Sequence, residues 1–118
     1  MNKELIINTY EDDILLFKEN LLGQLENNIL RYENETDSFQ INLTNQTFKK
    51  ENLESILEIN PKKALLTLKE LEKSFDIELS EHTFSNEKNK IMIRYLLESQ
   101  EKPLKIEIEM SDINAQNK

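Results

Sequence analysis

The spacing of apolar side chains changes along the chain, and this change constrains the fold more than any other feature of the sequence. Residues 104–110 alternate strictly between apolar and polar side chains, a period of two that is typical of a half-buried β-strand. Residues 91–97 are apolar on both faces apart from Arg94, which favours a central strand. We expect these two segments to pair as an antiparallel hairpin.

In the first third of the chain, apolar residues recur at a helical spacing. This row has a step of seven residues and consists of Leu15, Leu22 and Ile29. Thr9 followed by Asp12 resembles a capping box, and acidic residues just after it favour the positive end of a helix dipole. We therefore expect a long amphipathic helix over residues 10–34.

The middle of the chain predicts shorter elements. Residues 38–44 alternate like a strand, whereas residues 48–59 carry apolar side chains at helical spacing. Asn60 followed by Pro61 is a good helix start, because Asn caps and Pro suits the first helical position. We therefore predict one strand and two shorter helices, the second of them ending near Ser74.

Taken together, these segments predict an α+β fold. The expected order is α-β-α-α-(β)-β-β, with residues 75–84 ambiguous and the helices packed on a small antiparallel sheet. We expect a single domain over residues 1–110. Residues 111–118 have little to bury and are predicted to be a disordered tail.

Composition excludes several classes of site. With no Cys, one His and one Gly, the chain lacks the means for a disulfide scaffold, a thiolate or two-His metal site, or a glycine-rich phosphate loop. We therefore expect neither a metal nor a cofactor. The formal charge of −8 disfavours nucleic acid and anionic membranes as partners. No apolar run is long enough for a signal peptide or a membrane span, so we expect a cytoplasmic protein.

The balance of amino-acid types also indicates an origin. The chain has 14 Asn, 13 Lys and 13 Ile but no Val. Asn, Lys and Ile have AT-rich codons, so we infer an AT-rich genome, such as that of a bacterium, a phage or another mobile element.

Catalytic equipment is sparse. His82 would act as a general base if Glu78 or Glu81 oriented it, but no nucleophile or oxyanion-donor pattern accompanies it. We interpret His82 as a loop or surface residue. The acidic triplet at 11–13 would point in different directions on a helix, so we assign it to dipole compensation. The chain is therefore predicted not to be an enzyme, with an unusual enzyme of scattered site residues as the remaining possibility.

The distribution of charge carries the functional expectation. Residues 1–60 hold 12 acidic and 5 basic side chains, whereas residues 61–118 hold 11 and 10. On the predicted first helix, one row of carboxylates would form a ridge with Tyr32 as an exposed aromatic anchor. The row consists of Asp12, Glu19, Glu26 and Glu33. We expect these five residues to bind a basic partner protein.

The expected function is therefore that of a small acidic protein-binding module, a monomer or homodimer, that neutralises or escorts another protein by covering a basic surface. In size and charge the chain is similar to toxin-immunity proteins, antitoxins and phage-encoded inhibitors. The alternative is a homo-oligomeric structural, assembly or secretion-chaperone protein held together by the apolar face of the first helix. The predicted ridge is also open to a simpler interpretation as a solvated helix edge.

Overall fold

A computed structural model describes residues 1–113 and shows eleven antiparallel strands in that range, with no helix. The predicted α+β class is therefore wrong, and the part of the chain described is all-β. The strands are β1 (Asn2–Glu11), β2 (Ile14–Glu26), β3 (Ile29–Glu33), β4 (Ser38–Asn42), β5 (Thr47–Glu51), β6 (Ser55–Ile59), β7 (Ala64–Leu68), β8 (Lys73–Ile77), β9 (Leu79–Glu87), β10 (Lys90–Leu97) and β11 (Leu104–Asp112).

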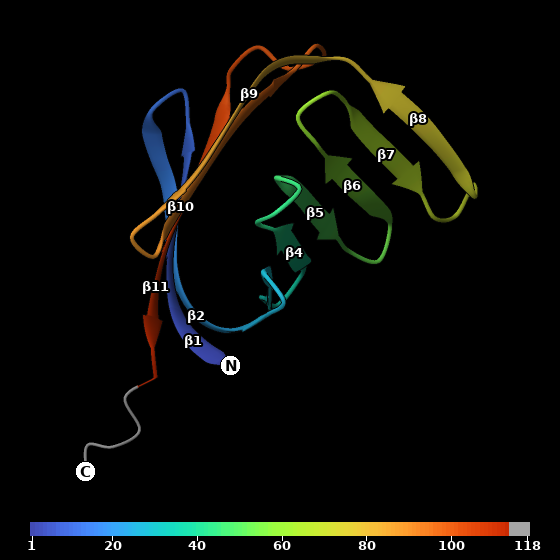
Figure 1. Cartoon of the computed structure of the whole chain (residues 1–118). Helices are drawn as coiled ribbons and strands as arrows, with labels where there is room; N and C mark the ends of the chain where they lie inside the picture. Colours follow the sequence, from blue (N-terminus) through green and yellow to red (C-terminus); the bar gives the residue numbers. More distant parts are fainter. Residues whose placement is uncertain (114–118) are drawn as a thin grey trace.

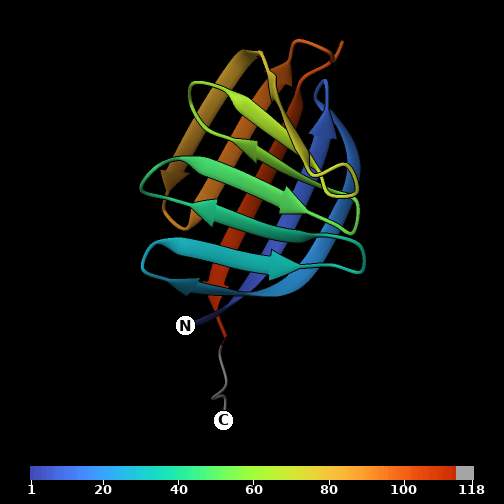
Figure 2. The same ribbon diagram turned by 90° about the vertical axis from the view of Figure 1, so that its right-hand side faces the viewer.

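All the strands belong to one nearly closed, barrel-like sheet. Its order is β8-β7-β6-β5-β4-β3-β2-β1-β11-β10-β9, so each strand pairs with its neighbour in sequence except at the β8–β9 junction. The sheet folds into two layers, with β1 and β9–β11 in one and β4–β8 in the other (Figure 1). The strands of the two layers cross one another (Figure 2). The long, curved β2 connects the layers, because it pairs with β1 along its length and with β3 only near its end.

The predicted helix over residues 10–34 is replaced by the end of β1 and by β2 and β3. From Phe17 onward, β2 alternates in its orientation, and Leu21, Gly23 and Leu25 face the interior. Two residues conceal this alternation in the sequence. Leu22 faces outward and is 67% exposed, whereas the polar Glu19 is half-buried. Tertiary pairing with β1 thus prevails over an apparent helical period.

The two shorter predicted helices are also wrong, because turns divide the first into β5 and β6 and the second into β7 and β8. Asn52 Oδ1 accepts hydrogen bonds from the backbone N–H groups of residues 54 and 55, both at 2.9 Å, and separates β5 from β6. Asn60 Oδ1 accepts the N–H groups of residues 62 and 63 at 2.8 and 3.0 Å, and separates β6 from β7. An asparagine side chain makes the same kind of bond at a helix N-cap and in an Asx turn, so the signal at Asn60-Pro61 fits both.

Three predicted strands are confirmed. The expected segments 38–44, 91–97 and 104–110 correspond to β4, β10 and β11, and β10 pairs with β11 as the predicted hairpin. Part of the ambiguous segment 75–84 belongs to β8 and β9. β11 continues to Asp112, and residues 114–118 of the predicted tail lie outside the described part of the chain.

Aliphatic side chains dominate the interior, and a row of aromatic rings crosses it. Tyr32 and Phe39 stack with ring centroids 4.7 Å apart, Phe39 lies 6.1 Å from Phe48, and Phe48 lies 6.2 Å from Tyr95. The row therefore runs from β3 through β4 and β5 to β10 and joins the two layers. The largest fully buried side chains around it are Phe48, Leu5, Leu30, Ile41, Ile59, Ile91, Ile93 and Ile108.

Gly23, the one glycine of the chain, lies where the backbone of β2 meets the core. A Cβ atom at this position would stand 2.6 Å from Leu5 Cδ1 and 3.0 Å from the carbonyl oxygen of Arg31. A glycine is needed here because the side chain of Leu5 occupies the space that a Cβ atom at position 23 would take.

Tight turns use residues other than glycine. The two-residue turns Asp12-Asp13, Asn27-Asn28 and Lys88-Asn89 have positive φ at both positions. Such turns match the twist of the flanking strands, and Asn or Asp adopts this conformation at a lower cost than most side chains do. Lys88, at φ 50°, lacks that advantage.

We therefore predict that Lys88→Asn stabilises the protein by about 0.5–1 kcal/mol, because a left-handed conformation costs an ordinary L-residue roughly 1–2 kcal/mol. Urea unfolding monitored by circular dichroism measures the change. Lys90→Asn, two residues away in regular strand conformation, is the matched control. Equal effects of the two substitutions would contradict the explanation from the turn.

Candidate functional site

Carboxylates gather where the β3–β4 and β5–β6 turns lie side by side. Five acidic residues and one lysine line a hollow of about 850 Å³ at these turns. We call this surface the acidic end; its charged residues are Glu33, Glu35, Asp37, Glu51, Glu54 and Lys69. The sequence alone does not group them, because they come from three separate segments of the chain.

The two turns that form the acidic end are held by local hydrogen bonds. Asn34 Oδ1 accepts the backbone N–H groups of Thr36 and Asp37 at 2.9 and 2.8 Å. Asn52 closes the neighbouring turn and donates from Nδ2 to Asp37 Oδ1 at 3.3 Å. This bond ties the β3–β4 turn to the β5–β6 turn, so the acidic end has a defined shape.

The carboxylates of the acidic end differ in how far they are already paired. Lys69 Nζ lies 2.7 Å from Glu51 Oε2, and its ammonium holds the pKa of that carboxyl below its usual value. Within residues 1–113, the side chains of Glu33, Glu35 and Glu54 have neither a salt bridge nor a hydrogen bond. These three exposed charges are therefore available to a cation from another molecule.

The acidic end continues onto β2. Asn34 Nδ2 donates to Glu19 Oε2 at 3.2 Å, which joins the β3–β4 turn to the middle of β2. Glu19 also lies close enough to Tyr32 to raise the pKa of that phenol, although burial is the larger cause. Tyr32 is 6% exposed and belongs to the core, so its predicted role as an exposed anchor has no structural basis.

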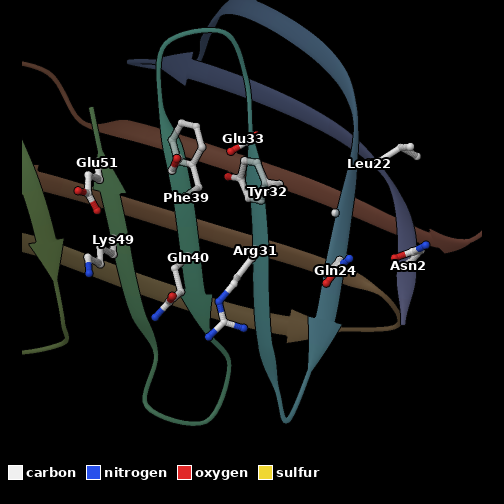
Figure 3. A pocket seen from close by; sticks show the side chains of 12 residues that line it. Asn2, Leu22, Gln24, Arg31, Tyr32, Glu33, Phe39, Gln40, Lys49 and Glu51 are labelled. Carbon is white, nitrogen blue, oxygen red and sulfur yellow. The ribbon is translucent and has the colours of Figure 1, made fainter. Parts of the chain in front are cut away.

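A second hollow, of about 590 Å³, lies on the outer face of β2–β5 and adjoins the acidic end. Figure 3 shows a row across these strands, and paired positions place its members beside one another: Gln24, Arg31, Gln40 and Lys49. Glu33 and Glu51 line this hollow as well as the acidic end. Its two basic side chains, Arg31 and Lys49, are matched by the two carboxylates.

The predicted carboxylate ridge does not exist in the form expected, because the helix that would have aligned it is absent. Glu19 and Glu33 reach the acidic end, one through Asn34 and the other as a lining residue. Asp12 lies in the β1–β2 turn and Glu26 ends β2 beside the β2–β3 turn. The structure thus brings two of the four predicted acidic residues together.

Apolar side chains are exposed on the projecting β1–β2 hairpin. Four consecutive residues at the start of β2 are between 48% and 65% exposed: Ile14, Leu15, Leu16 and Phe17. They are exposed because β3 pairs with β2 only at Gly23–Glu26 and does not reach the first part of that strand. The predicted helix over residues 10–34 would have turned Leu15 of this run toward its apolar face, whereas in β2 Leu15 is 50% exposed.

His82, considered above as a catalytic base, lies in β9 opposite Tyr95 rather than in a loop. Its Nε2 atom is buried and has no hydrogen-bond partner among the described residues. Burial lowers the pKa of this imidazole below its ordinary value. Residues 1–113 contain no group of three His, Asp or Glu side chains placed to hold a metal ion.

Residues 1–113 contain no helix that is long and apolar enough to cross a membrane. Comparisons of the chain with protein-family models, with curated proteins and with solved structures found no match.

The half-buried His82 imidazole, with its buried Nε2 atom, predicts a pH dependence of stability. Its pKa is lower in the folded than in the unfolded state, so the unfolded state binds more protons as the pH falls below about 6.5. The contribution of His82 is complete above that pH and decreases below it. The melting temperature of the wild type should therefore fall more steeply between about pH 7 and pH 5.5 than that of His82→Gln, as measured by thermal unfolding. Parallel curves would contradict the assignment.

Proposed function

We propose that this protein is a protein-binding module whose acidic end covers a basic surface of its partner. The supporting observation is the juxtaposition of unpaired Glu33, Glu35 and Glu54 around one hollow. Such a set of charges attracts a cationic surface over distance and speeds its association. Its neutralisation of a basic protein also fits the net charge of −8.

Apolar contact surface accompanies these charges. Leu53, at the tip of the β5–β6 turn, lines the acidic hollow and is 93% exposed. The exposed start of β2 lies beyond Glu19, which is bonded to the acidic end. Charged groups with nearby apolar side chains suit protein recognition, because charge sets the orientation and apolar burial adds affinity.

The proposal keeps the expected class, a cytoplasmic module that neutralises or escorts another protein, but changes the surface that acts. Binding would use a shaped end of the sheet in place of a helical ridge. The alternative of a homo-oligomer held by an apolar helix face depended on the helix over residues 10–34, which is absent. We further propose that the protein has no catalytic activity of its own.

We predict that reversing the three unpaired charges weakens binding of basic proteins by at least about tenfold. The variant is Glu33→Lys, Glu35→Lys and Glu54→Lys. Each exposed ion pair is worth roughly 0.2–1 kcal/mol, and reversal replaces attraction by repulsion. Immobilised protein would be exposed to a nuclease-treated bacterial lysate at low and moderate salt, and the captured proteins would be identified and then measured singly.

A matched control changes the net charge equally at exposed sites away from the acidic end: Glu26→Lys, Glu87→Lys and Glu109→Lys. The control should retain specific partners that the first variant loses. If both variants lose the same proteins to the same degree, net charge and not the acidic end governs binding, and the proposal is wrong.

A further inference from the structure

The first part of β2 has an open backbone edge. Residues Ile14–Leu22 pair with β1 on one side, and the ladder to β3 begins only at Gly23. Within residues 1–113, no strand pairs with the other side of this segment. We call residues Ile14–Leu22 the β2 edge. An open edge presents unpaired N–H and C=O groups to any extended chain that reaches it.

The hydrogen bonds at the end of β2 show which groups face outward along the β2 edge. The backbone N–H of Leu25 donates to the Met1 carbonyl at 2.9 Å, and the Met1 amine donates to the Leu25 carbonyl at 3.2 Å. Leu25 is therefore bonded to the β1 side. Because orientation alternates along an antiparallel strand and the register is regular here, Lys18 and Asn20 direct their backbone groups away from β1.

The side chains of the β2 edge suit a protein ligand. Ile14, Leu15, Leu16 and Phe17 expose apolar surface directly beside the open backbone. Further along the β2 edge, Glu19 is bonded to Asn34 of the acidic end. A chain lying along the β2 edge would thus pass from an apolar surface to a group of carboxylates.

A second copy of this chain fits the β2 edge poorly. In a two-fold antiparallel pairing of Ile14–Leu22 with itself, the midpoint residue faces its own copy. That residue is Lys18, and like charges directly opposite one another are destabilising. The register shift between Thr9 and Tyr10 also places an extra residue, Leu16, in β2, and such a bulge disfavours flat edge-to-edge pairing.

We propose that the β2 edge binds an extended segment of the partner protein, in which apolar side chains alternate with basic ones, as an added strand. Main-chain hydrogen bonds to Lys18 and Asn20 would hold the segment, and alternate side chains would give it specificity. Its basic side chains would face Glu19 and the unpaired carboxylates of the acidic end. This inference rests on the proposed function and identifies the conformation and chemistry of the segment that is bound.

The test removes one outward backbone donor and leaves the ladder to β1 intact. Asn20→Pro eliminates the N–H that faces the open side, and proline is tolerated on edge strands when its nitrogen faces outward. Asn20→Ala, which keeps the N–H, is the matched control. The probe is a fluorescein-labelled peptide of alternating lysine and valine, as long as the β2 edge, and its binding is measured by fluorescence anisotropy. A peptide with the same residues in two blocks is the control probe.

We expect the alternating peptide to bind the wild type and Asn20→Ala alike, and Asn20→Pro at least about tenfold more weakly. The block peptide should bind all three proteins weakly. Thermal unfolding checks that the variants are folded; if Asn20→Pro is not, the pair Lys18→Pro and Lys18→Ala takes its place.

Other outcomes separate the two proposals. Equal binding by the proline and alanine variants would overturn strand addition. Loss of basic partners by the charge-reversed variant of the acidic end would still support the proposed function. Failure of the alternating peptide to bind the wild type would overturn strand addition. The lysate experiment on the charge-reversed variant would still test the proposed function, because it does not use this peptide. A wild-type dimer that Asn20→Pro converts to a monomer would assign the β2 edge to a second copy.

Discussion

The contact between Phe48 and Tyr95 is the interaction on which the rest of the structure depends. It is the point where the row of aromatic rings crosses from the layer of β4–β8 to the layer of β9–β11 and β1. Phe48 is 1% exposed, and burial of a large ring is among the strongest single contributions to a small core. Because the Phe48–Tyr95 contact holds the two layers together, β2 must bend to pair with a strand in each direction. As a result β3 separates from the first part of β2. The acidic end and the β2 edge are both consequences of that bend.

Short hairpins make this arrangement possible in a chain with one glycine. Asn34, Asn42, Asn52 and Asn60 each accept two backbone N–H groups from the turn that follows. Equivalent members of this set are eighteen residues apart, as Asn34 and Asn52 are, which is the length of one pair of strands with its turns. The abundant asparagine that indicates an AT-rich genome therefore also has a structural use, because its side chain satisfies turn amides that glycine would leave to water.

The sequence allowed the C-terminal strands to be predicted but not the N-terminal ones, and the difference has a physical cause. From Leu104 to Met110, β11 is apolar at every inward position and polar at every outward position, so period and burial agree. In β2 the outward Leu22 and the inward Glu19 violate that alternation, and the apolar residues of the same segment also fit a helical period. Both exceptions belong to the surface inferred to bind a partner. The site itself was predictable only as an excess of acid in residues 1–60, because the pairing of β3–β6 decides which carboxylates meet.

Selection for folding alone does not account for the composition of the β2 edge. Exposed Leu15, Leu16 and Phe17 next to open backbone favour aggregation, and a polar residue at any of these positions would reduce that hazard without loss of core packing. The same segment carries a bulge and a central lysine, which are devices that hinder self-pairing. The β2 edge thus keeps its apolar side chains but hinders pairing with a second copy of itself. This pattern is expected where the edge binds a segment of another protein. Natural sequences depart from local consistency chiefly at functional sites, and here the departure, the open backbone and the adjoining carboxylates coincide on a single surface.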